Sequence, residues 1–297
     1  MNACDARTIL PSELIINPDG SVFHLHLKPE QIADTIILVG DPARVDLVAA
    51  RFDTRELRTA NREFVAVTGT YRKKRMTVLS TGIGTDNIDI VATELDALAN
   101  VDFATRRVRP AAERRQLTML RLGTSGALQP DLSIGDLVFA RTSVGMDGLL
   151  NFYEGRDRVC DLEMERALTA HTGWNERLAA PYCVDADAGL YELFRSATTA
   201  GITVSAPGFY APQGRRVRLC PAFSDLNERM ESFEWRGLRI TNLEMESSAL
   251  AGLAALMGHR AATICTIIAQ RVAGEATPDY RPFVERMIDL ALERLAV

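Results

Sequence analysis

The chain has 297 residues, of which 47% are hydrophobic and 25% are charged, the proportions of an ordinary globular protein. Its formal net charge of −5 argues against a nucleic-acid partner, and its apolar runs are shorter than the roughly 18 residues that a membrane helix needs. The cysteines show neither a CxxC pattern nor a metal-ligand spacing, and no signal peptide is recognisable. We therefore expect a cytoplasmic protein whose thiols are buried, namely Cys4, Cys160, Cys183, Cys220 and Cys265.

Apolar runs rich in β-branched residues alternate with helical patterns along the chain. Buried strands are predicted at residues 35–40, 76–84, 117–123, 136–144 and 262–269. Helices are predicted at residues 41–52, 88–100, 161–174, 189–201, 244–258 and 281–295, the last with Phe283, Met287, Ile288 and Ala291 on one face. This alternation predicts an α/β fold with a largely parallel central sheet.

Two segments depart from the alternation. In residues 11–27, a turn at 17–20 separates two strand-like runs, and the second run would carry His24 and His26 on one face. Residues 105–116 are rich in arginine and are predicted to be a solvated surface loop. Because no linker or repeat divides the chain, we expect one domain over residues 22–297, preceded by an N-terminal extension over residues 1–21.

The first predicted strand ends at a candidate anion site, in the sequence GDPARV (40–45). Asp41 is a good N-cap and Pro42 suits the first helical position, so capping alone explains both residues. Capping does not explain Gly40, which leaves backbone amides open, or Arg44, whose charge opposes the helix dipole in the first turn. A bound phosphate would reconcile them.

Two more glycine-containing turns are predicted after strands. In RLGTSG (121–126), Arg121 lies near the strand end, and the hydroxyls and unhindered amides that follow suit a phosphate or a sugar. A tight turn with local serine and threonine bonds explains the same residues. In STGIGTDN (80–87), Asn87 replaces the last glycine of the dinucleotide-binding pattern, which argues against a Rossmann site.

The segment TNLEMES (241–247) has two interpretations. Thr241 and Glu244 have the spacing of a capping box, which leaves Glu246 unexplained. If residues 240–246 are instead extended, Glu244 and Glu246 share one face of a strand. A carboxylate at the end of that strand can accept hydrogen bonds from two neighbouring hydroxyls of a sugar.

The loop GFYAPQGRR (208–216) combines an aromatic face with an amide and a guanidinium. Phe209 and Tyr210 stand beside Gln213 and Arg215, a combination that suits a flat polar ligand. The histidines show no metal-ligand spacing and no recognisable pairing with a nucleophile, and they are His24, His26, His171 and His259. Neither a metal centre nor covalent catalysis is predicted.

Taken in order, these stretches resemble the nucleoside phosphorylase family, and within it the uridine phosphorylases. The resemblance covers about residues 22–295, and its motifs are FHL (23–25), GDPARV (40–45), NREF (61–64), STGIG (80–84), RLGTSGALQP (121–130), GDLV (135–138), FYAPQGR (209–215), NLEMES (242–247) and QRVAGE (270–275). It implies a three-layer α/β/α domain around a mixed, partly barrel-like sheet. It also implies reversible phosphorolysis of uridine to uracil and ribose 1-phosphate, with inorganic phosphate as co-substrate and no required cofactor.

The resemblance also implies a role for each matching residue. The phosphate ligands would be Gly40, Arg44, Arg121, Thr124 and, from a neighbouring subunit, Arg62. The ribose contacts would be Met245, Glu246 and, across the same interface, His24 for the 5′-hydroxyl. The base would be bound by Phe209, Gln213, Arg215 and Arg271. The family assembles as dimers or as trimers of dimers, so a homo-oligomer is expected.

Two departures from the family pattern accompany these matches. Relatives place a monovalent cation between subunits at the positions of Glu63, Ile83 and Asn87, and they have a serine where this chain has Asn87. Because Asn87 keeps a side-chain oxygen there, a potassium site at the subunit interface stays open as an alternative. Residues 105–116 are an insertion relative to the short bacterial enzymes. The alternatives are a purine nucleoside phosphorylase, a nucleosidase that uses water, and a non-catalytic nucleoside-binding protein.

Overall fold

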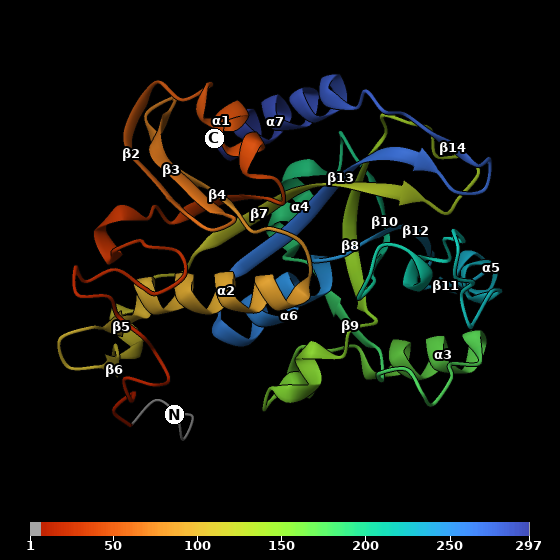
Figure 1. The fold of residues 1–297 in the computed structure, drawn as a ribbon, viewed down its shortest axis with the longest axis horizontal. Helices are drawn as coiled ribbons and strands as arrows, with labels where there is room; N and C mark the ends of the chain where they lie inside the picture. The colour runs from red at the N-terminus through yellow and green to blue at the C-terminus, as the bar shows by residue number, and fades with distance from the viewer. Residues whose placement is uncertain (1–6, 297) are drawn as a thin grey trace.

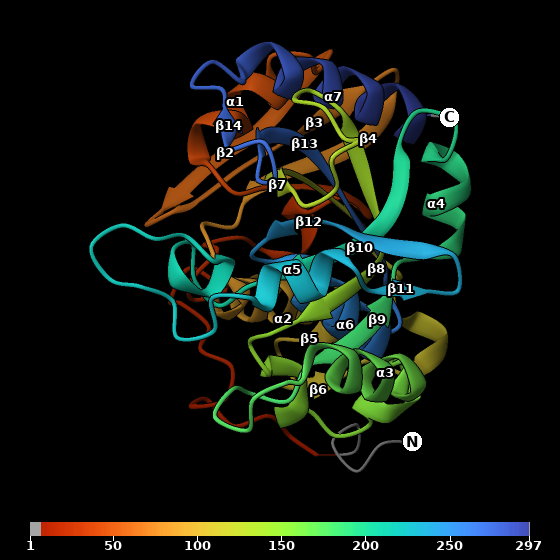
Figure 2. The same ribbon diagram turned by 90° about the vertical axis from the view of Figure 1, so that its right-hand side faces the viewer.

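The computed structural model describes residues 7–296. They form three layers, with helices on both faces of a central β-sheet (Figure 1). The helices are α1 (Pro42–Ala49), α2 (Thr85–Asn100), α3 (Leu162–Thr172), α4 (Ala188–Phe194), α5 (Leu226–Glu231), α6 (Ser247–Met257) and α7 (Arg281–Leu295). Helices α1 and α7 cover one face of the sheet, and α2 and α6 cover the other (Figures 1 and 2). Among the described residues, no helix has both the length and the apolar character needed to cross a bilayer.

The main sheet has 12 strands and is mixed. Its strands are β1 (Thr35–Val39), β2 (Thr54–Asn61), β3 (Phe64–Tyr71), β4 (Lys74–Ser80), β7 (Thr118–Ala127), β8 (Leu137–Gly145), β9 (Tyr182–Asp185), β10 (Thr199–Ser205), β11 (Glu234–Trp235), β12 (Leu238–Glu244), β13 (Arg260–Gln270) and β14 (Glu275–Ala276). Two short strands, β5 (Val101–Asp102) and β6 (Arg107–Val108), pair separately. Strands β12, β10, β8, β13 and β7 close into a ring, because β12 also pairs with β7. This confirms the predicted barrel-like sheet.

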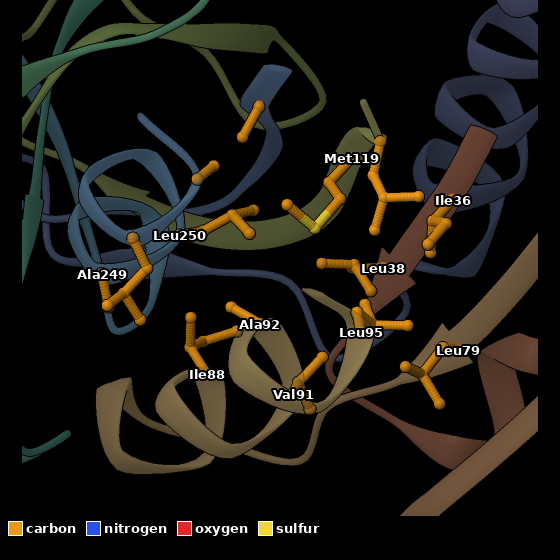
Figure 3. Close-up of a cluster of buried hydrophobic side chains, with 14 of the residues drawn as sticks. Ile36, Leu38, Leu79, Ile88, Val91, Ala92, Leu95, Met119, Ala249 and Leu250 are labelled. Carbon is orange, nitrogen blue, oxygen red and sulfur yellow. The ribbon is translucent and has the colours of Figure 1, made fainter. Parts of the chain in front are cut away.

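Each central strand is buried on both faces, as expected for a sheet between two helical layers. On β1, Ile36 and Leu38 face the α2–α6 layer, while Ile37 and Val39 face the α1–α7 layer. Helix α2 fits this layer because its apolar residues recur at helical spacing. Figure 3 shows the side chains that meet there, which are Ile36, Leu38, Leu79, Ile88, Val91, Ala92, Leu95, Met119, Ala249 and Leu250. The site-bearing turns therefore start from a rigid core.

The predicted strands and helices are largely confirmed, with two exceptions. The helix predicted at 189–201 ends at Phe194, and strand β10 begins at Thr199. Strand β10 pairs with both β8 and β12, and this pairing overrides the helical spacing of its first residues. The two strand-like runs on either side of the 17–20 turn form only a single bridge between Ile16 and Val22. His26 has a φ of 49°, so His24 and His26 do not share a strand face as predicted.

The arginine-rich stretch at 105–116 lies at the surface, as predicted, but two of its arginines hold other segments in place. Arg106 donates to the carbonyls of Ile9 at 2.8 Å and Leu10 at 3.1 Å. Arg115 pairs with Asp34 at 2.8 Å and donates to nearby carbonyls. These contacts attach residues 9–10 and 29–34 to the stretch that follows α2.

The cysteines follow the expectation only in part. Cys183 and Cys265 are buried, Cys160 is partly buried, and Cys220 is exposed on the loop that follows Arg215. Cys4 lies outside the described residues, so its predicted burial remains a prediction.

Candidate active site

A cavity of about 1320 Å³ collects most of the predicted site residues, and it has room for two small ligands side by side. Turns at the ends of β1, β4, β12 and β13 line it, together with β7 and the loop after β10. The predicted residues that line it are Gly40, Arg44, Arg121, Thr124, Phe209, Gln213, Arg215, Met245, Glu246 and Arg271. His24 and Arg62 are not among its lining residues.

One end of the cavity has the properties of an anion site. Strands β1 and β7 run parallel with Val39 opposite Leu122, so Gly40 and Thr124 lie near the same edge of the sheet. The Asp41 carboxylate caps α1 as predicted, accepting from the Ala43 amide at 2.9 Å. Arg44 follows in the first turn. Backbone amides, the positive end of the helix and a guanidinium thus converge on one place.

Arg121 lies fully buried between two carboxylates. Its Nη1 donates to Glu244 Oε2 at 3.0 Å, and its Nη2 pairs with Glu246. Burial by itself would lower the pKa of Arg121, but the two carboxylates outweigh it and raise that pKa above its ordinary value. The Nε of Arg121 is buried with no acceptor among the described residues. The two carboxylates therefore keep the guanidinium charged at the cavity wall.

Glu244 is a fixed part of this arrangement. Strand β12 continues through Glu244, so the capping box predicted with Thr241 does not form. The predicted extended segment 240–246 is confirmed only as far as Glu244, because Glu246 lies beyond the strand as the N-cap of α6. The Glu244 carboxylate accepts from Ser205 Oγ at 2.6 Å and from the backbone amides of Glu246 and Ser247 at 2.9 and 3.0 Å. With Arg121 added, its lone pairs are filled. It can hold Arg121 in place but cannot bind a ligand.

Glu246 is the glutamate that can bind a ligand. One of its oxygens accepts from the Gly84 amide at 2.7 Å, and the other pairs with Arg121. Burial raises the pKa of Glu246, Arg121 opposes this shift, and Glu244 reinforces it. Each carboxylate oxygen keeps an open lone pair beside Met245 at the cavity wall. Two hydroxyl donors can be accepted there.

Gly123 makes room for the buried guanidinium. Residues 123–126 do not form the predicted turn, because β7 continues to Ala127 through its pairing with β13. A Cβ at Gly123 would overlap Arg121 Nη1 and would lie 2.9 Å from Cys265 Sγ. Only a residue without a side chain lets the guanidinium lie against the strand at this point.

The other end of the cavity is lined by polar side chains from the loop after β10. Gln213 ends a 3₁₀ turn (Ala211–Gln213) and is only 3% exposed. Arg215 Nη1 donates to Gln213 Oε1 and to the Phe209 carbonyl, both at 2.6 Å, and the guanidinium lies 3.7 Å from the Phe209 ring centroid. Arg271 Nη2 donates to the Gln213 carbonyl at 2.9 Å. Burial, reinforced by Arg271, lowers the pKa of Arg215 to about 10.

His24 and Arg62 lie together on a different surface. The Arg62 guanidinium lies 5.9 Å from the Phe23 ring centroid, and the Phe23 ring meets His24 edge-on at 4.9 Å. Asn61 donates to the His24 carbonyl at 2.8 Å. The tip of the β2–β3 hairpin and the segment around Phe23 thus form one patch, which we call the His24–Arg62 patch.

At the candidate cation position, two of the three predicted ligands bond to each other. Glu63, Ile83 and Asn87 all line the cavity, and Asn87 Nδ2 donates to Glu63 Oε1 at 3.3 Å. Because a carboxylate only accepts hydrogen bonds, the Asn87 amide nitrogen must face Glu63 and the amide oxygen must face away from Glu63. A cation would need that oxygen, so the present geometry does not fit a cation bound by all three residues. Among the described residues, no cluster of His, Cys, Asp and Glu is placed to hold a metal ion.

Two contributors to the site had no assigned role in the sequence. The Gly84 amide that holds Glu246 lies in the STGIGTDN turn, whose glycines were the available signal. Tyr280 lies under Arg44, with the guanidinium 5.9 Å from its ring centroid, and no sequence pattern marks it. Both contacts join segments far apart in the chain.

Comparison with known proteins gives the same family as the motifs. The family model described as "Phosphorylase superfamily" matches residues 34–296. A uridine phosphorylase from Thermococcus kodakarensis is 31% identical, with 86% of this chain and 80% of that protein covered. A guanosine phosphorylase from Halorubrum lacusprofundi is 30% identical, with 84% of each chain covered.

A solved structure shares the fold over nearly its full length. It is the Trypanosoma brucei nucleoside phosphorylase, whose description reports uridine phosphorylase activity. The TM-score is 0.86 at 30% identity, with 95% of this chain and 99% of that chain covered. The sequence, the fold and the cavity agree, and the chain belongs to the phosphorylase superfamily.

Proposed function

We infer that the protein is a uridine phosphorylase, a pentosyltransferase that converts uridine and phosphate to uracil and ribose 1-phosphate. The observation that carries this inference is the order of hydrogen-bonding groups at the end of the cavity that Gln213 and Arg215 line. Because Arg215 donates to Gln213 Oε1, the amide is oriented with Oε1 toward Arg215 and Nε2 away from it. The order along this edge is therefore Gln213 Nε2 as donor, Gln213 Oε1 as acceptor and the Arg215 guanidinium as donor.

Uracil presents the complementary order along one edge, namely the O2 acceptor, the N3–H donor and the O4 acceptor. Gln213 Nε2 would donate to O2, the second lone pair of Oε1 would accept from N3–H, and Arg215 would donate to O4. Cytosine would place an amino group before Arg215 and a bare N3 before Oε1, two unfavourable contacts. Arg271 fixes the Gln213 backbone and thereby the register of the whole edge.

The remaining groups suit the other two parts of the reaction. Arg44, Arg121 and the amides near Gly40 and Thr124 would bind phosphate, and the fact that all four residues line the cavity supports an anionic ligand there. Glu246 would accept from the 2′- and 3′-hydroxyls of the ribose. The pentose would then lie between the phosphate and the base.

Phosphorolysis at this site needs charge stabilisation rather than a covalent enzyme intermediate. A phosphate oxygen bonds to C1′ while the bond between C1′ and the uracil nitrogen N1 breaks, and the bonding electron pair leaves with the base. The sugar gains cationic character opposite the phosphate, and the base gains negative charge on O2 and O4. Gln213 Nε2 and Arg215 would donate to these oxygens at the point where the charge develops.

We also propose that the active unit contains a second copy of the chain. His24 and Arg62 lie off the cavity of their own chain yet share one patch, as expected if both reach the cavity of a neighbour. Arg62 would then contact phosphate, and His24 the ribose 5′-hydroxyl. A dimer or a trimer of dimers would satisfy this arrangement. The free thiols of the described cysteines support a reducing compartment, and we propose a cytoplasmic location.

The deciding experiment measures release of free base from uridine, thymidine, cytidine, inosine, guanosine and adenosine, with and without inorganic phosphate. We expect rapid, phosphate-dependent release of uracil and little release from cytidine or the purine nucleosides. Equal release without phosphate would indicate a nucleosidase. A preference for inosine or guanosine would indicate a purine phosphorylase, and binding of uridine without turnover would indicate a nucleoside sensor.

A further inference from the structure

Helix α2 carries a buried carboxylate that its amphipathic pattern does not explain. Glu94 is only 7% exposed and lies on the side of the helix where Val91, Leu95 and Leu98 enter the core. A buried carboxylate is costly unless hydrogen bonds satisfy it. The bonds that the structure gives Glu94 all come from His24 and Leu25.

These bonds fix both the position of the His24 backbone and that of its ring. Glu94 accepts from the His24 and Leu25 amides at 3.1 and 2.9 Å, and its Oε1 lies 2.6 Å from His24 Nδ1. The ring is further held edge-on by Phe23 at 4.9 Å and Phe64 at 6.4 Å. The imidazole therefore has one orientation in the His24–Arg62 patch.

The same contact fixes the tautomer of a neutral His24. A carboxylate only accepts hydrogen bonds, so Nδ1 must carry the ring proton and Nε2 must present a lone pair. The side chain is 28% exposed, which leaves it accessible to a ligand at the patch. A carboxylate bonded to one imidazole nitrogen also makes the other a better acceptor.

We propose that Glu94 is a positioning residue for nucleoside recognition, because it turns His24 Nε2 outward as an acceptor for the ribose 5′-hydroxyl. This inference rests on the proposed function, in which His24 reaches the cavity of a second copy. A free 5′-hydroxyl has the proton that Nε2 needs. A 5′-deoxy nucleoside lacks it, and a 5′-phosphate offers only negative oxygens to a lone pair backed by a carboxylate. The pair therefore selects nucleosides over nucleoside 5′-monophosphates.

The test compares Glu94→Gln with the wild-type protein on uridine and 5′-deoxyuridine. In the variant, the amide nitrogen faces Nδ1 and moves the ring proton to Nε2. One hydrogen bond of about 1 kcal/mol corresponds to about fivefold in kcat/KM. We expect the wild-type preference for uridine over 5′-deoxyuridine to shrink by about that factor. Glu94→Asp, which keeps the carboxylate, is expected to retain more of the preference than Glu94→Gln.

Nitrogen-15 NMR of the imidazoles reads the tautomer without relying on activity. At mildly alkaline pH, wild-type His24 is expected to carry its proton on Nδ1, and in Glu94→Gln on Nε2. The matched control is Asp96→Asn on the same helix. It replaces the carboxylate that contacts another histidine, His259. It is expected to leave the preference for uridine unchanged, even if the melting temperature falls.

The outcomes separate this inference from the proposed function. If the wild-type protein phosphorolyses uridine but His24 carries its proton on Nε2, the inference is wrong and the function stands. The same holds if the wild-type protein shows no preference for the 5′-hydroxyl, or if a folded Glu94→Gln retains the full preference. If wild-type protein releases no uracil in the presence of phosphate, the proposed function itself is wrong.

Discussion

Replacing Gln213 with alanine tests the assignment of the base end most directly. The side chain is 3% exposed, and in the proposed complex it would make two of the three contacts to the uracil edge. Loss of one donor to an oxygen that gains charge in the transition state costs about 3–4 kcal/mol, or 10²–10³-fold in rate. The lost acceptor for N3–H adds only ~1 kcal/mol. We expect kcat/KM for uridine to fall by about 10³-fold.

A matched variant separates the donor from simple loss of volume. Gln213→Glu has nearly the same shape, but its carboxylate would face O2 without a proton and would pair with Arg215. We expect uridine turnover to fall at least as far as in Gln213→Ala and to recover partly at acid pH, where a protonated glutamate donates. The assay is the rate of uracil release, with melting temperature as the check on folding. Wild-type turnover in a folded Gln213→Ala would refute the base assignment.

Three further predictions concern the anion, ribose and cation positions. Arg62→Ala and Arg44→Ala, each inactive alone, are expected to regain part of the phosphorolysis rate when co-assembled, whereas no regain would exclude a shared site. The raised pKa of Glu246 means that its active, charged form is lost as the pH falls, starting above the range of an ordinary glutamate. The acid limb of the profile of kcat/KM against pH is therefore expected above the ordinary pKa of about 4.3 and to disappear in Glu246→Gln. Exchanging potassium for tetramethylammonium is expected to leave the wild-type melting temperature unchanged and to lower that of Asn87→Ser, and a saturable wild-type response to potassium would contradict this.

The layers of the fold could be predicted from the sequence because the pattern that specifies them is local. Apolar runs such as 35–39 and periodic segments such as 281–295 need no distant information to be recognised. Strand β10 was missed because its first residues, 199–201, were included in the helical pattern of 189–201, and only the pairing of β10 with β8 and β12 shows that they belong to a strand. Closure of the ring through the β12–β7 pair is likewise a long-range event.

The candidate site divides along the same line. Residues in short motifs, such as Gln213 and Arg215, could be proposed from their neighbours in the chain. The role of Glu244 could not be predicted in this way, because the sequence TNLE (241–244) is compatible both with a capping box and with the end of a strand. Its hydrogen bond to Arg121 joins positions 123 residues apart. Glu94 had no local signal at all, since its partners lie 69 and 70 residues away.

Gly123 shows that an absent atom can be as necessary to a site as a charged group. The space a methyl group would fill is taken by the Arg121 guanidinium, so even alanine would displace this arginine from its two glutamates. Such a change would alter neither the net charge nor any group that could touch substrate. A natural variant at this position would therefore change no residue that contacts substrate, and yet we would expect it to be a loss-of-function allele.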